Sequence, residues 1–277
     1  HRLDVVLPFV DKVFHVGNRN VNEITDRENY LKEQSTEIED TCSTFSGTLP
    51  AFSLADVAFA VKERDILNGV TFDILKGSRT VLLGENGCGK TTLLRLISRL
   101  EKPTRGVILQ NIDDKFGQKS KQSKKWYKKV GVVYQNPDYQ LFMQTVEKEI
   151  KFGAKSDEYA DEIAEKFGIK HLYARHPQSL SEGQKRRVSI AAGGGKDPEV
   201  LILDEPTVGQ DYKGLCEMVE VLNKLHEEAH NTMITVTHDK RCAAALCDKS
   251  VWIKNGKTYK TGGKELVDEF FIQIGVN

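Results

Sequence analysis

The strongest chemical signal in the chain is the loop Gly84–Thr91, which reads Gly-Glu-Asn-Gly-Cys-Gly-Lys-Thr and matches the pattern G-x-x-x-x-G-K-[ST]. Glycines let such a loop curl so that successive backbone N–H groups point at phosphate oxygens, and a following helix adds the positive end of its dipole. We predict that Lys90 reaches the β- and γ-phosphates of a nucleotide and that the Thr91 hydroxyl binds Mg²⁺. The other predicted phosphate contacts are Gly84, Asn86, Gly87, Cys88, Gly89 and Thr92.

Two adjacent carboxylates follow a second apolar run. Val200–Leu203 has the composition of a buried strand, and Asp204 and Glu205 come directly after it. At such a strand end we expect Asp204 to hold Mg²⁺ and Glu205 to polarise the attacking water. Two acids after a strand also occur in ordinary turns, so this prediction depends on the phosphate loop upstream.

Gln135 and His238 also stand at the ends of apolar, strand-like runs. We expect the Gln135 amide to reach Mg²⁺ and the γ-phosphate, and the His238 imidazole to hydrogen-bond the γ-phosphate and sense its loss. Taken alone, either residue is more simply part of a surface loop. Their order along the chain relative to the other motifs favours the catalytic interpretation, in which His238 acts with Lys90 and Glu205.

These side chains must be positioned by a sheet and by the helices that cover it. Thr91–Leu100 has apolar residues at helical spacing, and Val146–Ser179 is polar and helix-favouring. Strands that alternate with helices imply a mostly parallel sheet covered on both faces. We therefore predict an α/β fold with a parallel sheet core, an antiparallel β subdomain from about Phe52 and an inserted helical subdomain at about 136–185. The runs that read as buried strands are Thr80–Leu83, Val130–Tyr134, Val200–Leu203 and Met233–Val236.

Composition narrows the functional classes. The 277 residues are 39% hydrophobic and 29% charged, with 40 Lys and Arg against 40 Asp and Glu. This balance argues against a nucleic-acid partner, and the lysine-rich stretch Lys115–Lys129 is expected to be a solvated loop. No apolar run approaches the ~20 residues of a membrane helix. Five cysteines without a C-x-x-C pair indicate neither a disulfide framework nor a zinc site, and they suit a reducing cytosol.

The first 50 residues do not continue the pattern of the rest of the chain, and they suggest an internal repeat. The matches share one offset and pair His1 with His238, Asp11-Lys12 with Asp248-Lys249, and Asn18 with Asn255. We predict that residues 1–32 are the C-terminal remnant of a preceding, similar domain, that 33–51 form a linker and that 52–277 form the main domain. Chance similarity is the alternative, because only four positions match.

The sequence Leu-Ser-Glu-Gly-Gln at Leu180–Gln184 decides the class. Together with the motifs above, it resembles the signature of the ATP-binding-cassette (ABC) ATPases, and the resemblance covers roughly Phe52–Tyr259. It implies an ABC-type P-loop NTPase in which Ser181, Gly183 and Gln184 contact the γ-phosphate of ATP held by another domain. ATP and Mg²⁺ are the implied ligands, and a second ABC ATPase domain, fused upstream or bound as a dimer partner, is the implied partner.

Two further stretches narrow the resemblance. Val133–Phe142 and Thr145–Gly153 are similar to the pattern F-Q-N-P-x-x-Q-L-F…T-V-x-x-E-x-x-F-G of ATPases in energy-coupling factor (ECF) and cobalt-type importers. The resemblance implies a peripheral protein on the cytoplasmic face of the cell membrane that powers vitamin or metal-ion uptake. Its implied membrane partners are an integral coupling protein and a substrate-binding component. The residues expected either to contact the coupling protein or to pack inside the helical subdomain are Tyr139, Leu141, Phe142 and Met143.

The sequence departs from the family pattern at three positions. Val61 replaces the aromatic residue that usually stacks on adenine, Glu182 replaces a signature glycine, and Gln210 replaces a leucine expected where the two domains pack. The alternatives to an importer ATPase are a soluble tandem ABC protein acting in translation or repair, and a half that binds ATP without hydrolysing it. The Q-N-P-x-x-Q segment argues against the first, and intact Glu205 argues against the second.

Overall fold

The computed structural model describes residues 10, 12–17, 20–26, 29–30, 38, 45–62, 64–112 and 124–275. The repeat positions His1, Asp11 and Asn18, most of the predicted linker and positions 113–123 of the lysine-rich stretch lie outside the described residues. The rest of that stretch is not a loop, because α4 spans Lys124–Lys129. None of the described helices combines the length and the apolar character needed to cross a membrane.

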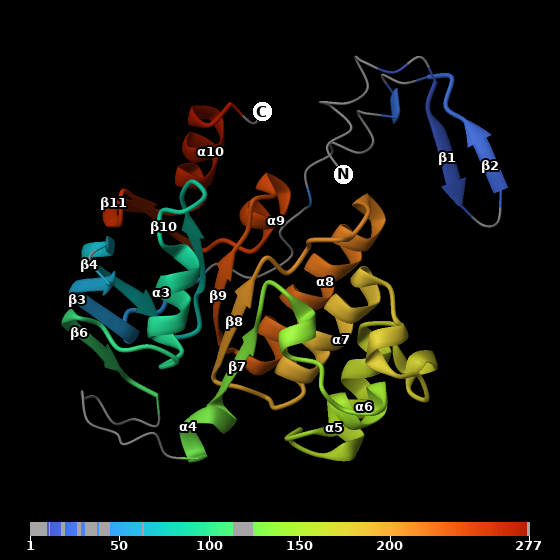
Figure 1. Cartoon of the computed structure of the whole chain (residues 1–277), viewed down its shortest axis with the longest axis horizontal. Helices are drawn as coiled ribbons and strands as arrows, with labels where there is room; N and C mark the ends of the chain where they lie inside the picture. The colour runs from blue at the N-terminus through green and yellow to red at the C-terminus, as the bar shows by residue number, and fades with distance from the viewer. Residues whose placement is uncertain are drawn as a thin grey trace.

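A six-stranded sheet forms the centre of the main domain, with strand order β11-β10-β5-β9-β8-β7 (Figure 1). All neighbours are parallel except β11, which pairs antiparallel with β10. The strands β5, β8 and β9 are buried along their whole length, which is why they read as continuous apolar runs. Their bounds are β5 Arg79–Leu83, β7 Val130–Val133, β8 Val200–Asp204, β9 Thr232–Val236, β10 Lys249–Lys254 and β11 Lys257–Gly262.

The predicted antiparallel subdomain is a three-stranded sheet of order β4-β3-β6. Its strands are β3 Pro50–Val61, β4 Arg64–Leu75 and β6 Arg105–Gln110. Helix α3 (Lys90–Ile97) contributes Leu93, Leu94, Leu96 and Ile97 to one apolar core shared with side chains of both sheets. The helix ends three residues earlier than Thr91–Leu100 predicts, since the chain turns at Arg99, whose φ is 59°. Strand β3 likewise begins at Pro50, inside the predicted linker 33–51.

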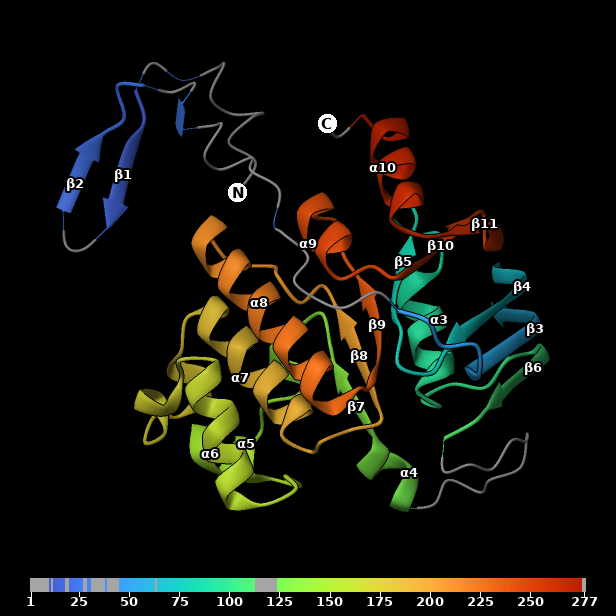
Figure 2. The same cartoon turned by 180° about the vertical axis from the view of Figure 1, so that it is seen from behind.

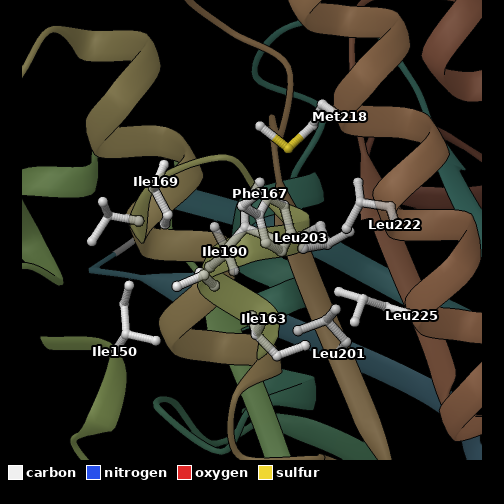
Figure 3. Close-up of a cluster of buried hydrophobic side chains, with 14 of the residues drawn as sticks. Ile150, Ile163, Phe167, Ile169, Ile190, Leu201, Leu203, Met218, Leu222 and Leu225 are labelled. Atoms are coloured by element: carbon white, nitrogen blue, oxygen red, sulfur yellow. The ribbon is translucent and has the colours of Figure 1, made fainter. Parts of the chain in front are cut away.

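The predicted helical subdomain is present between β7 and β8. It comprises α5 (Val146–Lys151), α6 (Asp157–Lys166), short 3₁₀ turns and the start of α7 (Glu182–Gly194). A second apolar core joins it to the sheet, with Ile163 and Phe167 facing Leu201 and Leu203 of β8, and Leu222 of α8 (Tyr212–Ala229) closing the cluster (Figure 3). This packing holds α7 against the sheet. Seen from behind, α7 and α8 lie side by side (Figure 2).

The remaining described elements lie at the two ends of the chain. Helices α9 (Lys240–Ala245) and α10 (Lys264–Gln273) follow β9 and β11 and pack with β5 and β10 in a third apolar cluster. At the N-terminal end, β1 (Phe14–Gly17) and β2 (Asn20–Glu23) form an antiparallel hairpin.

Candidate nucleotide site

A pocket of about 880 Å³ opens where β5, β7, β8 and β9 end, which is the edge of an open α/β sheet where ligands bind. Parallel strands bring together there segments that are far apart in the sequence. The predicted residues that line this pocket are Asn86, Gly87, Cys88, Gly89, Lys90, Thr91, Thr92, Gln135, Asp204, Glu205 and His238.

The phosphate loop wraps the start of α3. Gly84 and Gly89 adopt φ of 153° and 105°, and a Cβ at either position would come within 2.5 Å of Ile253 O or of a Leu67 methyl group. Only glycine fits this curl. Gly84 does not line the pocket itself, but its carbonyl accepts a 2.6 Å hydrogen bond from Lys90 Nζ, which also donates to Glu85 O at 3.0 Å. The ammonium group is thus held beside the loop, in the lining of the pocket.

Two oxygen ligands suited to Mg²⁺ meet at the end of β8. The Thr91 hydroxyl donates to Asp204 Oδ2 at 3.2 Å, and burial raises the pKa of Asp204 above its ordinary value. Mg²⁺ is bound in such sites by one or two protein oxygens together with phosphate oxygens. The pair therefore fits the ion, and Gln135 adds an amide at the same pocket.

Glu205 is buried beside Asp204, and its backbone is strained. Its φ is 55°, a left-handed value that costs about 1 kcal/mol or more for a residue with a Cβ. Burial, with a smaller contribution from the Asp204 charge, raises the pKa of Glu205 to about 7. Its Oε1 is buried without a hydrogen-bond partner. A carboxylate with a pKa near neutrality and a free oxygen is suited to accept a proton from water.

The signature residues lie elsewhere. Ser181, Gly183 and Gln184 begin α7 and do not line the pocket. Ser181 and Gln184 form a capping box, in which Ser181 Oγ accepts from Gln184 N at 3.3 Å and Gln184 Oε1 accepts from Ser181 N at 3.1 Å. Gln210, expected to concern packing between domains, donates instead to Gly183 O at 3.0 Å within this chain. Within this chain, the signature residues and the pocket are therefore separate.

At the other end of the pocket, Val61 lines the wall and is half exposed, whereas Phe59 packs against the core. Strict alternation would place both residues on one face of β3. A register shift between Phe59 and Ala60 breaks this alternation. Arg64 and Ile66 of β4 complete this wall, which has no aromatic side chain from β3.

Two functional positions were not predicted from the sequence. Arg186 is buried and donates to Tyr134 O at 2.6 Å and to Gln135 O, so it fixes the backbone that presents Gln135. The sequence did hold a signal for its burial: Arg186 precedes Ile190 by four residues, so the two side chains share the buried face of α7. Glu149 is also buried, and its Oε2 accepts from the backbone N–H groups of Phe142 and Met143 at 2.9 and 2.7 Å.

Comparisons with known proteins agree with this geometry. Residues 67–208 match the model of the ABC transporter family. The energy-coupling factor transporter ATP-binding protein EcfA2 of Enterococcus faecalis is 39% identical over 221 residues, which cover 74% of each chain. EcfA2 of Bacillus subtilis is 40% identical over 210 residues, covering 72% of this chain and 76% of the relative.

Solved structures show the same fold. CbiO1 from Clostridium perfringens, described as part of the ABC transporter complex cbiONQ, superposes with a TM-score of 0.70 and 32% identity over 80% of this chain and 92% of its own. The ATP-binding cassette MJ0796, solved as a dimer in a post-hydrolysis state with ADP and Pi, gives a TM-score of 0.68 and 25% identity over 77% and 98% of the two chains. The chain therefore belongs to the ABC transporter family, as an ATP-binding and ATP-hydrolysing protein of the energy-coupling factor type, which powers a membrane importer.

Proposed function

We propose that the pocket binds ATP with Mg²⁺ and that the residues gathered there perform in-line hydrolysis of the γ-phosphate. The observation that carries this proposal is the convergence of the phosphate loop, Gln135, the Asp204–Glu205 pair and His238 on one cavity. The backbone N–H groups of the loop and Lys90 bind the phosphates. Thr91, Gln135 and Asp204 hold Mg²⁺, which when bound neutralises charge on the phosphate oxygens.

Glu205 is the proposed water-orienting residue. Its Oε2 is fixed by the His238 backbone N–H, and its unpartnered Oε1 is left as the acceptor for the water that attacks the phosphorus. Lys90 stabilises the charge that develops on the transferred group. Burial and the nearby Lys90 charge lower the pKa of His238, so that its neutral imidazole can donate one hydrogen bond to the γ-phosphate.

The signature half requires a second domain. We propose that Ser181, Gly183, Gln184 and the start of α7 contact ATP held in the phosphate loop of a second ABC ATPase domain. The positive end of the α7 dipole and the N–H groups of Glu182 and Gly183, which precede the capped N–H of Gln184, suit a phosphate. The dimeric solved structure of the cassette MJ0796 is consistent with such pairing.

A membrane partner is proposed for the surface beyond Gln135. Tyr139 and Phe142 are 81% and 68% exposed, and Phe142 meets Phe152 edge to face at 5.4 Å. Exposed aromatic side chains of this kind mark an interaction surface. Leu141 is buried in the core and serves internal packing instead. We propose that this aromatic surface (Tyr139, Phe142 and Phe152) contacts the integral coupling protein of a vitamin or metal-ion importer, with a separate substrate-binding component, at the cytoplasmic face of the membrane.

The domain assignment also stays a proposal, and the N-terminal hairpin supports it. In β1–β2, Gly17 pairs with Asn20 and Val16 with Val21. In β10–β11, Lys254 pairs with Lys257 and Ile253 with Thr258, at the same offset as the sequence matches. We propose that residues 1–32 are the end of a preceding ABC ATPase domain, joined by a linker that starts at residue 33 and ends where β3 begins at Pro50. A second phosphate loop and signature in the sequence upstream of His1 would support this, and an unrelated sequence there would contradict it.

Substitution of Glu205 by Gln tests the catalytic proposal. The amide keeps the shape of the side chain but cannot accept a proton, so we expect steady-state ATP hydrolysis to fall by about 10²-fold or more while ATP binding is retained. Binding is measured by equilibrium dialysis and hydrolysis by phosphate release. Glu227→Gln, at an exposed position of α8 outside the pocket, is the matched control. Turnover that survives Glu205→Gln would show that another group orients the water.

A further inference from the structure

Helix α7 is hydrogen-bonded to the loop that follows β7, which spans residues 134–140. Arg186 donates to the carbonyls of Tyr134 and Gln135, and Gln140 Nε2 donates to Ser189 O at 2.7 Å. These bonds fix the two ends of the loop to the helix whose first turn is the signature. The loop and the signature are therefore neighbours in space, although some 40 residues separate them in the chain.

Lys185 lies between these hydrogen bonds. Among the described residues, it is the only charged side chain that contacts a charged side chain of the loop and one of the signature. Its Nζ donates to Asp138 Oδ1 at 2.9 Å and to Glu182 Oε1 at 3.3 Å. The Lys185 side chain is only 9% exposed. The hydrogen bond with Asp138 raises the pKa of Lys185, so the ammonium group is charged at neutral pH. Charge-assisted hydrogen bonds in a partly buried setting are stronger than exposed ones.

The two carboxylates that Lys185 contacts lie in segments with different proposed functions: Asp138 lies next to the aromatic surface, and Glu182 lies in the signature. Asp138 directly precedes Tyr139 of the aromatic surface, and both lie in one 3₁₀ turn, Pro137–Tyr139. Glu182 lies between Ser181 and Gly183, at the position where the chain departs from the family pattern. Without the cation, the two carboxylates would repel each other. The departure at Glu182 thus supplies a second partner for Lys185.

We propose that Lys185 is a positioning residue that ties the aromatic surface to the signature, so that a displacement of one moves the other. The inference rests on the proposed function, in which the signature contacts ATP bound by a second domain and the aromatic surface contacts a membrane protein. Lys185 touches neither ATP nor the reacting atoms. It acts through Asp138 and Glu182.

Hydrogen exchange measured by mass spectrometry tests this coupling. The parent chain carries Glu205→Gln to retain ATP, and exchange is compared with and without Mg-ATP over residues 84–91 and 136–143. We expect ATP to slow exchange in both segments of the parent. Lys185→Met should reduce the ATP-induced change over 136–143 by at least half and leave the protection over 84–91 intact. Lys185→Arg, which keeps the charge, should restore the change.

Three further variants separate coupling from general structural damage. Over residues 136–143, Asp138→Asn should reproduce the effect of Lys185→Met, and the double variant should add nothing there, because both changes break the contact between Lys185 and Asp138. Lys224→Met removes an exposed cation paired with Glu220 on α8 and should leave both segments unchanged.

The outcomes of the exchange experiment are distinguishable. An undiminished ATP response over 136–143 in Lys185→Met, or no such response in the parent, overturns the role of Lys185. Absence of ATP protection over 84–91 in the parent overturns the proposed function itself, and the coupling inference falls with it.

Discussion

His238 holds Glu205 through its backbone and not through its ring. The His238 N–H donates to Glu205 Oε2 at 3.2 Å, whereas the imidazole Nε2 lies 3.5 Å from Oε1, which has no hydrogen-bond partner. The two residues follow neighbouring parallel strands, β9 and β8, so the sheet itself sets their distance. The carboxylate thus keeps its backbone hydrogen bond when the imidazole is removed, and the ring is available for a ligand.

Removal of the imidazole should therefore impair chemistry and spare structure. In His238→Ala we expect kcat for ATP hydrolysis to fall by about 10²-fold, as for loss of one charge-stabilising donor, with KM changed by less than about threefold. Steady-state kinetics measures both constants. His171→Ala, at an exposed position in the helical subdomain, is the control. A large rise in KM with unchanged kcat would instead assign His238 to ground-state binding.

An aromatic residue at position 61 should strengthen nucleotide binding. Val61 lines the pocket and is half exposed, and Phe59 is turned into the core. Stacking on a base contributes about 1–3 kcal/mol, so Val61→Tyr should lower the Kd for ATP by about fivefold or more. Titration with a fluorescent ATP analogue measures the change, and Val61→Leu controls for added apolar area. Equal affinity in the Tyr and Leu variants would show that the base does not reach this wall.

Loss of the buried ion pair at the start of β5, the end away from the pocket, should strongly lower the free energy of unfolding. Arg79 Nη2 donates to Asp248 Oδ1 at 2.6 Å, and Nη1 donates to Asn223 Oδ1 at 3.0 Å. Arg79→Met leaves the buried Asp248 without its counter-ion and should lower the free energy of unfolding by about 3–5 kcal/mol. Urea denaturation measures this loss. Lys224→Met breaks an exposed ion pair and should lower the free energy of unfolding by about 0.5 kcal/mol or less. Equal losses in the two variants would show that burial does not strengthen the Arg79–Asp248 pair.

Cys88 should report on occupancy of the phosphate loop. Its free thiol lines the pocket, and burial raises its pKa above the ordinary value of a cysteine thiol. Because the thiolate is the reactive form, alkylation should be slow at neutral pH and accelerate as the pH rises into the alkaline range. Mg-ATP should slow the reaction at every pH by covering the loop. Mass spectrometry of the peptide that contains Cys88 follows the rate. Alkylation that ATP does not affect would place the nucleotide elsewhere.

Much of this architecture is local in origin and was predictable. The strands β5, β8 and β9 read as short apolar runs because parallel strands are buried on both faces. The loop Gly84–Thr91 and the pair Asp204–Glu205 follow such strands directly, so their convergence on one edge of the sheet followed from the strand pattern. The sequence pattern did not predict the helix and strand ends to the residue: α3 ends at Ile97, three residues before the predicted end. The final turn of a helix depends on packing more than on periodicity.

What the sequence by itself determined is the chemistry: which motifs occur, in which order, and that they match ATP hydrolysis. The tertiary structure alone decided the direction in which side chains point. A register shift turns Phe59 inward and leaves Val61 at the pocket, and the core takes Leu141 while Phe142 stays exposed. The structure also brought Lys185 to Asp138. The physical reason is the same in each case: orientation is set by bulges and by packing partners that lie far away in the chain, and no local pattern encodes those contacts.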